Sequence, residues 1–300
     1  MIFGVFVNPR KEQVKQPLEQ LDNWVGKSKP DVQFLLCTYN STFTKNKYQN
    51  ITIVTEQEIL DKADVVLTLG GDGTILRSVQ ALRSTDIPIL GVNLGGLGFL
   101  ADTAPEALIE NVESFIDGKY IIEKRAVLQC SVKGTSKSFI AFNDLVVDKA
   151  GFSRVIEIIT KVDGNLLNSY IADALILSTP SGSTGYSLSA GGPIVIPQTD
   201  VFILNPICPH SLTNRPVVVP NKSIVTLKVF TEHKEVNLFG DGQLVSSFPS
   251  GSEFKISKAD YRVSLVKMKQ HDFFETLRNK LNWGEDFRDK NRWSYDYPSA

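Results

Sequence analysis

The Gly-Gly-Asp-Gly-Thr sequence at residues 70–74 combines three glycines with a single carboxylate, and this combination could carry chemistry. Glycines let a backbone approach a phosphate closely, and the N–H groups of a turn that opens a helix point at such an anion. A carboxylate repels phosphate, so Asp72 indicates work on a hydroxyl that lies beside the phosphate. The alternative is an ordinary tight turn in which Asp72 caps a helix, and the turn alone favours neither interpretation.

The residues on both sides of this turn predict a strand and a helix. Residues 65–69 (Val-Val-Leu-Thr-Leu) form a short β-branched and aliphatic run, which is typical of a buried strand. After the turn, apolar residues recur at helical spacing, namely Ile75, Leu76, Val79 and Leu82. We therefore expect a strand, a glycine turn and a helix in that order.

Strands and helices alternate over the first 120 residues or so. Alternation of this kind predicts a doubly wound, Rossmann-like parallel sheet that is covered by helices. Ligands of such sheets bind beyond the carboxyl ends of the strands, which is where residues 70–74 would fall. The expected strands are residues 2–7, 33–36, 52–54, 65–69 and 87–92, and the expected helices include residues 18–24, 56–62 and 105–116.

The pattern becomes β-rich from about residue 122 and returns to helix at residues 272–281. The dipeptide Asp163-Gly164 is a hairpin turn signal. We expect an α/β domain of residues 1–121 with 271–300, and a β-rich domain of residues 122–270. The expected strands of the second domain are residues 126–130, 138–147, 155–162, 175–177, 201–204, 224–229, 236–239 and 263–266.

The composition excludes several classes of protein. Lysine plus arginine (32) nearly balances aspartate plus glutamate (33), so no net field favours nucleic acid or a membrane surface. We find no apolar run of about 18 residues and no signal-peptide pattern at the N-terminus, and we expect a cytoplasmic chain. Neither a disulfide framework nor a zinc site is expected from the spacing of Cys37, Cys130, Cys208, His210, His233 and His271.

Three further stretches are rich in glycine or small polar residues: Asn-Asp at 143–144, residues 178–193, and Gly-Asp-Gly-Gln at 240–243. Together with residues 70–74, and in this order along nearly the whole chain, they resemble the ATP-dependent NAD kinase family. Diacylglycerol and sphingosine kinases share the 70–74 motif, but they typically carry a glutamate where this chain has Arg77. The specific signal is therefore the stretch at 179–193. The resemblance also implies that the first domain binds nucleotide and that the β-rich domain binds NAD and forms the oligomer. It further implies a terminal segment that packs back on the first domain.

The resemblance implies transfer of the γ-phosphoryl group of ATP to the 2′-hydroxyl of the adenosine ribose of NAD, which gives NADP. Phosphoryl transfer depends on alignment and on charge neutralisation more than on covalent help from the protein. Gly71, Gly73, Thr74 and Arg77 are expected to bind phosphates. Asp72 is the candidate general base for the ribose hydroxyl. We recognise no dedicated metal cage, so a divalent ion, expected to be Mg²⁺, would arrive with ATP.

Asn143 and Asp144 are similar to the adenosine-binding pair of the family, and the Asp144 carboxylate can accept hydrogen bonds from ribose hydroxyls. Without the resemblance, such residues would be strand-end side chains that cap a turn. At Ile171, some family members carry a basic residue near the dinucleotide, and the choice between NAD and NADH stays open. Other family binding positions match Phe99, Arg154, Asp173, Thr184, Gly185, Tyr186, Ser187, Leu188, Ser189 and Gln243.

Two alternatives to an NAD kinase remain on the residues alone. A lipid kinase would need an apolar channel or a membrane-facing surface, and we see neither in the sequence. A non-catalytic NAD(P)-binding module is disfavoured by the joint presence of Asp72, Arg77, Asn143 and Asp144. The resemblance also implies a homodimer or homotetramer formed through the β-rich domain. The phosphoryl donor, ATP or inorganic polyphosphate, stays open.

Overall fold

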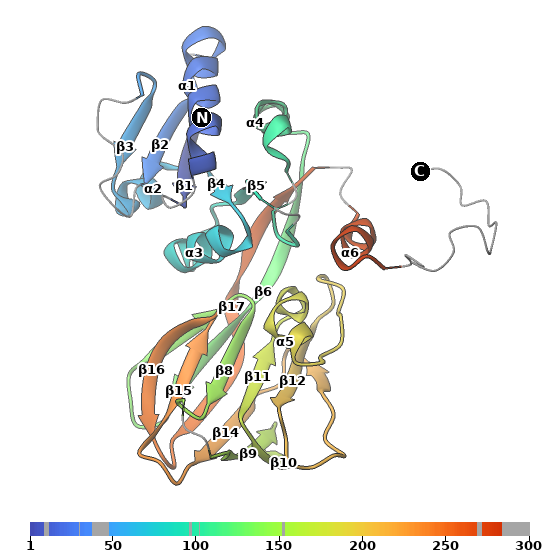
Figure 1. Cartoon of the computed structure of the whole chain (residues 1–300). Coiled ribbons are helices and arrows are strands. Elements are labelled where there is room, and N and C mark those ends of the chain that lie inside the picture. The colour runs from blue at the N-terminus through green and yellow to red at the C-terminus, as the bar shows by residue number, and fades with distance from the viewer. Residues whose placement is uncertain are drawn as a thin grey trace, which may run out of the picture.

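The computed structural model describes residues 1–8, 12–29, 31–37, 48–95, 98–101, 103–151, 154–268 and 272–283. Figure 1 shows an N-terminal region of strands and helices and a larger region of strands, joined by the long strands β6 and β17. None of the helices in these ranges combines the length and the apolar character that a membrane span requires.

The N-terminal region is built on a parallel sheet in which each strand pairs with its neighbours in the order β3–β2–β1–β4–β5. The chain moves outward from β1 in one direction and then in the other, so the order reverses between β1 and β4. Such a reversal marks the ligand-binding edge of a doubly wound sheet. The strands are β1 (Ile2–Val7), β2 (Gln33–Cys37), β3 (Ile51–Val54), β4 (Val65–Gly70) and β5 (Ile89–Asn93).

Helices cover both faces of this sheet. On one face, Leu18 and Val112 pack against Phe3 in one apolar cluster. On the other face, Ile59 and Val79 pack in a second cluster. The first face carries η1 (Glu12–Val14), α1 (Lys15–Ser28), η2 (Pro105–Ala107) and α4 (Leu108–Ile116), and the second carries α2 (Glu56–Lys62) and α3 (Asp72–Leu82).

The β-rich region packs two sheets around one core, which includes Tyr170, Phe202 and Phe254. One is a six-stranded sheet in the order β13–β12–β11–β8–β15–β16. The other contains β10, β9, β14, β17, β6 and β7. The strands are β6 (Ile121–Val132), β7 (Ser138–Ala141), β8 (Asp144–Asp148), β9 (Ile156–Val162), β10 (Asn165–Ala172), β11 (Ala174–Ser178), β12 (Val201–Ile207), β13 (Val217–Pro220), β14 (Val225–Phe230), β15 (Glu235–Gly240), β16 (Gln243–Pro249) and β17 (Glu253–Lys267).

Strand β17 connects the two regions. It pairs antiparallel with β6 along its length, and at Leu265 it pairs parallel with Ile89 of β5. The parallel sheet of the first region and one sheet of the second are therefore a single 11-stranded sheet. The predicted division at residues 121 and 122 falls at the start of β6 and stays a prediction, and of residues 271–300 only 272–283 are described.

The predicted fold class is confirmed, and so is the hairpin at Asp163-Gly164, whose residues have φ of +49° and +82° between β9 and β10. Residues 138–147 were predicted as one strand but form two, because the chain breaks its pairing at Phe142 and Asn143. Strand β17 begins ten residues before the predicted 263–266, at Glu253.

The last described helix, α6 (Phe273–Leu281), returns to the first region. Asp72 and Phe99 of that region both contact it: the ring of Phe273 lies 6.3 Å from the ring of Phe99, and Lys280 pairs with Asp72. Its first turn is capped by Asp272, whose carboxylate accepts a hydrogen bond from the N–H of Phe274. The predicted terminal helix therefore lies against the Asp72 turn.

Candidate active site

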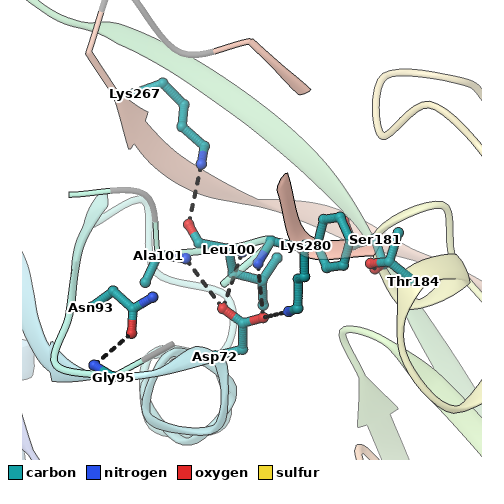
Figure 2. A network of polar contacts seen from close by, with 10 residues as sticks. Asp72, Asn93, Gly95, Leu100, Ala101, Ser181, Thr184, Lys267 and Lys280 are labelled. Carbon is teal, nitrogen blue, oxygen red and sulfur yellow. Dashed lines mark hydrogen bonds and ion pairs between the residues drawn. The ribbon is translucent and has the colours of Figure 1, made fainter. Parts of the chain in front are cut away.

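The carboxylate of Asp72 lies at the junction where β4 ends at Gly70 and α3 begins. Its Oδ2 accepts a hydrogen bond from the N–H of Phe99 at 3.0 Å. Its Oδ1 accepts two more, from the N–H groups of Leu100 at 3.1 Å and Ala101 at 3.3 Å. Figure 2 shows Leu100 and Ala101 beside this carboxylate. A carboxylate has about four acceptor positions, so the hydrogen bonds of the described residues leave about one on Oδ2.

A buried lysine supports the loop that holds Asp72. The ammonium of Lys267, at the end of β17, donates a hydrogen bond to the carbonyl oxygen of Leu100 at 3.1 Å (Figure 2). The same peptide unit carries the N–H of Ala101 that donates to Asp72. A cation at the carbonyl end polarises this peptide and strengthens its N–H as a donor. Lys267 is therefore a positioning residue that acts on Asp72 through the backbone.

A second lysine contacts Asp72 directly. The Nζ of Lys280, on α6, lies 3.8 Å from Oδ2 of Asp72 and 4.2 Å from the centre of the Phe99 ring. Both side chains of the ion pair keep about a third of their surface exposed, at 33% for Lys280 and 29% for Asp72. The pair therefore borders the solvent-facing side of the turn.

A cavity of about 300 Å³ opens beside the Asp72 turn. It brings together four predicted phosphate-binding residues from the N-terminal end of α3 with Gln243 from the β-rich region. An open helix N-terminus and the exposed cation of Arg77 both favour an anion here. The lining residues are Asn8, Gly71, Gly73, Thr74, Leu76, Arg77, Asp241 and Gln243.

A second cavity, of about 570 Å³, contains the predicted adenosine-binding pair. Asn143 and Asp144 lie where β7 gives way to β8, and Asp173 and Tyr186 line the same space. Asp144 is 4% exposed, and burial together with the nearby charge of Asp241 raises the pKa of its carboxyl to about 7. Asp173 is bound to Lys149, with Oδ1 2.7 Å from Nζ. The cavity thus offers carboxylates and amides, which suit ribose hydroxyls and a base.

Asp241, from the Gly-Asp-Gly-Gln stretch, is a site residue that the sequence reasoning missed. Its carboxylate accepts hydrogen bonds from three successive backbone N–H groups, those of Phe142 (2.9 Å), Asn143 (2.7 Å) and Asp144 (3.3 Å). Burial raises its pKa, and these bonds oppose the shift. Asp241 sits at the β15–β16 turn with φ of +50°, a conformation that Asp tolerates. The Asp-Gly pair at this turn was the available signal.

Gln80 connects this carboxylate to the Asp72 helix. The side-chain amide of Gln80, on α3, donates to Oδ2 of Asp241 at 3.1 Å and to the carbonyl oxygen of Ile140 at 3.2 Å. Asp241 and Leu76 line both the 300 Å³ and the 570 Å³ cavities. The phosphate-side cavity and the Asn143–Asp144 cavity are therefore neighbours with a shared wall.

The glycine-rich stretch at 178–193 packs against the residues that line the second cavity. It forms η3 (Ser181–Thr184) and α5 (Tyr186–Ser189), and the hydroxyl of Thr179 donates to the carbonyl oxygen of Phe142 at 2.7 Å. A side chain at Gly185 would lie within 4 Å of both Asn143 and Asp144. This stretch therefore packs directly against the predicted adenosine-binding pair.

Several predicted residues lie outside the lining of the second cavity. Ser187 is buried and accepts hydrogen bonds from the amide of Asn205 through its carbonyl oxygen and its hydroxyl. Arg154 is exposed and forms an ion pair with Glu232. Phe99 is buried beside Asp72 against α6. Gln243 lines the phosphate-side cavity instead, and the others that do not line the second cavity are Thr184, Gly185, Leu188 and Ser189.

Comparison with known proteins identifies the family. The family model of the ATP-NAD kinase N-terminal domain matches residues 3–120, and that of the ATP-NAD kinase C-terminal domain matches residues 142–268. The chain belongs to the ATP-NAD kinase family. The predicted resemblance is thus confirmed over nearly the whole chain.

Curated NAD kinases agree with this assignment. The NAD kinase of Natranaerobius thermophilus is 42% identical over 227 residues, which cover 75% of this chain and 79% of that protein. The NAD kinase of Cytophaga hutchinsonii is 37% identical over 301 residues, which cover 96% of this chain and 100% of that protein. The similarity therefore includes both regions and the connections between them.

Two solved structures extend the comparison to the fold. The yeast NADH kinase in complex with NADH has a TM-score of 0.86 at 26% identity, covering 96% of this chain and 89% of that one. An NAD kinase from Archaeoglobus fulgidus in complex with ATP has a TM-score of 0.70 at 26% identity, covering 94% and 99%. The chain is a phosphotransferase that acts on an alcohol group, and NAD kinase is supported over the lipid kinase and non-catalytic alternatives.

The family implies a divalent metal ion, and the described side chains limit how it could be held. Within the described ranges, no three His, Cys, Asp or Glu side chains gather closely enough to hold a metal ion. The oxygens of Asp72 and Asp241 are largely used by backbone N–H groups. This donor set fits an ion that is bound through nucleotide phosphates rather than in a protein cage.

Proposed function

We propose that Asp72 is the general base for the transfer of the γ-phosphoryl group of ATP to the 2′-hydroxyl of the adenosine ribose of NAD. The observation that carries this assignment is the shared wall between the two cavities. A phosphate bound at the N-terminal end of α3 would lie next to a ribose held by Asn143 and Asp144. Asp72 lies between Gly71 and Gly73 of the phosphate-side cavity. Asp241 is the carboxylate in the shared wall, but its two oxygens already accept four hydrogen bonds, so Asp72 is the better candidate base.

The roles of the other residues follow from their positions. The N–H groups of Gly71 and Gly73, the hydroxyl of Thr74 and the cation of Arg77 bind and align the ATP phosphates. Asp144 accepts hydrogen bonds from ribose hydroxyls and orients the 2′-hydroxyl. Asp72 accepts the proton of that hydroxyl at the acceptor position left on its Oδ2. Mg²⁺, bound with ATP, would neutralise phosphate charge.

Tyr186, Asp173 and Gln243 complete the binding surface in this account. Tyr186 is 51% exposed beside the second cavity, so its ring is free to stack on a base. Asp173, oriented by Lys149, offers a further acceptor. Gln243 faces the phosphate-side cavity. Phe99 and Arg154 remain proposed contacts that require the dinucleotide to extend beyond the second cavity.

The chain is also proposed to act in the cytoplasm as a homodimer or homotetramer formed through the β-rich region. Large apolar side chains are exposed on and near β10, among them Leu166 (66%), Ile171 (39%) and Leu212 (90%). Such side chains favour burial against a second copy. Light scattering at micromolar concentration should give a dimer or tetramer, and a fully active monomer would contradict this assembly.

A coupled assay tests the proposed reaction. Purified chain, NAD, ATP and Mg²⁺ should form NADP, detected with an NADP-specific dehydrogenase. Replacing NAD by NADH would identify the preferred acceptor, and replacing ATP by inorganic polyphosphate would identify the preferred donor. Diacylglycerol and sphingosine with radiolabelled ATP are the control acceptors and should stay unlabelled. Labelled lipid without NADP formation would overturn the proposal.

A further inference from the structure

The position of Asp72 creates an electrostatic problem for phosphate binding. Its carboxylate lies at the first residue of α3, where the backbone otherwise favours an anion. The residues after it line the phosphate-side cavity. A negative charge at that point opposes the approach of a triphosphate, because like charges a few ångströms apart repel.

Lys280 is placed to cancel this charge. Its ammonium is 3.8 Å from Oδ2, which accepts one hydrogen bond, from Phe99, among the residues that the structure describes. The same ammonium lies 4.2 Å from the centre of the Phe99 ring, a favourable cation–π position. The contact between the rings of Phe99 and Phe273 holds the start of α6 in place. Two separate interactions therefore direct the Lys280 side chain to the solvent-facing side of Asp72.

The nearby cations do not serve this purpose. Lys267 is 1% exposed, and its ammonium donates to the carbonyl oxygen of Leu100 rather than to the carboxylate. Arg77 is exposed on the next turn of α3 and lines the phosphate-side cavity. Of the described side chains, Lys280 is the cation that forms an ion pair with Asp72.

We propose that Lys280 is a further residue of the phosphoryl-transfer site, and that its pairing with Asp72 makes the turn neutral enough to admit the ATP triphosphate. The C-terminal helix is then part of the site and not only a support for the first region. In this role Lys280 acts through Asp72, so it is a positioning residue. The inference rests on the proposed use of this turn for ATP.

Binding of ATP with Mg²⁺, measured by titration calorimetry without NAD, tests the charge relationship apart from turnover. Lys280→Gln should weaken ATP binding by about tenfold, since an unpaired carboxylate then faces the phosphates. Lys280→Arg should bind ATP within a few-fold of the unmodified chain. Asp72→Asn combined with Lys280→Gln should recover most of the lost affinity, because the repelling charge is gone. A purely structural role for Lys280 predicts no such recovery.

Arg278→Gln is the matched control. It removes a positive charge from the same helix, but the charge of Arg278 faces Asp272 and not Asp72. Its ATP affinity should stay unchanged, and thermal unfolding of each variant should show that α6 still packs. Unchanged ATP affinity in Lys280→Gln would overturn the proposal, as would a double variant as weak as Lys280→Gln alone. NADP formation by the unmodified chain, assayed in parallel, shows separately whether the proposed function holds.

Discussion

The backbone N–H of Asp144 donates a hydrogen bond to Oδ1 of Asp241 at 3.3 Å, so one acidic residue fixes the backbone of another within the same cavity. Burial and the charge of Asp241 together raise the pKa of Asp144 to about 7. A carboxyl group with a pKa this high destabilises the folded chain when it ionises. The fold therefore maintains Asp144 in an unfavourable position, as is common for residues that bind a ligand.

Removal of the Asp144 charge should stabilise the chain in a pH-dependent way. The pKa is about 7 when folded and about 4 when unfolded, so stability is lost as the pH rises from about 4 to about 7. At pH 8, Asp144→Asn should therefore raise the free energy of unfolding by about 2–4 kcal/mol at most, and the variant should unfold at a higher temperature than the unmodified chain. Near pH 4 the substitution should give no gain in stability.

Thermal unfolding followed across this pH range checks the stability prediction. Asp260→Asn, at an exposed position of β17, is the control and should leave the curve unchanged. A gain for Asp144→Asn that is equally large at pH 4 and pH 8 would show that ionisation of Asp144 is not its cause.

Truncation of Asn143 should weaken NAD binding. Its Oδ1 is buried without a hydrogen-bond partner in the described structure, which marks it as an acceptor available to the dinucleotide. Asn143→Ala should lower NAD affinity by about 1–3 kcal/mol, since a buried polar group of the ligand loses its partner. Calorimetry gives the affinity, with Asn165→Ala on exposed β10 as the control. Unchanged affinity in both Asn143→Ala and Asp144→Ala would place the dinucleotide elsewhere.

Substitution of Asp241 should disturb the adenosine side indirectly. In Asp241→Asn, an NH₂ group replaces an oxygen that accepts hydrogen bonds from the amide of Gln80 and the N–H of Phe142. The new NH₂ group is a donor and cannot accept either bond. We expect NAD affinity to fall about tenfold. Gln80→Ala removes one of the four donors and should have a smaller effect. A Gln80→Ala variant that loses more NAD affinity than Asp241→Asn would contradict this role of the Asp241 carboxylate.

Local patterns were enough to predict the Asp72 turn, since a β-branched run, a glycine turn and apolar residues at helical spacing occur within residues 65–82. The choice of Asn143 and Asp144 as an adenosine-binding pair came from the family resemblance and not from a local pattern, and it stays a prediction. The three N–H groups that hold Asp72, and the pairing of Asp241 with residues 142–144, join segments 27 to 99 positions apart. Spacing in the sequence carries no signal for such contacts.

Glycines near the site illustrate the same limit. A Cβ atom at Gly98 would collide with Oδ1 of Asp72, and one at Gly182 would collide with the carbonyl oxygen of Asn143. Both glycines are required by a neighbour that is distant in the chain. Strands β10, β13 and β16 were missed for a related reason. Many of their residues are exposed, and their extended conformation depends on pairing with neighbouring strands.

Steady-state turnover of Asp72→Asn against Asp144→Asn tests the central assignment most directly. Asp72→Asn keeps the size of the side chain but removes the basic oxygen, so kcat should fall by about 10²–10⁴-fold while the calorimetric NAD affinity changes little. Asp144→Asn should instead lose NAD affinity. If Asp72→Asn turns over NAD within a few-fold of the unmodified chain, while Asp144→Asn binds NAD normally and is inactive, Asp144 is the base and the account is wrong.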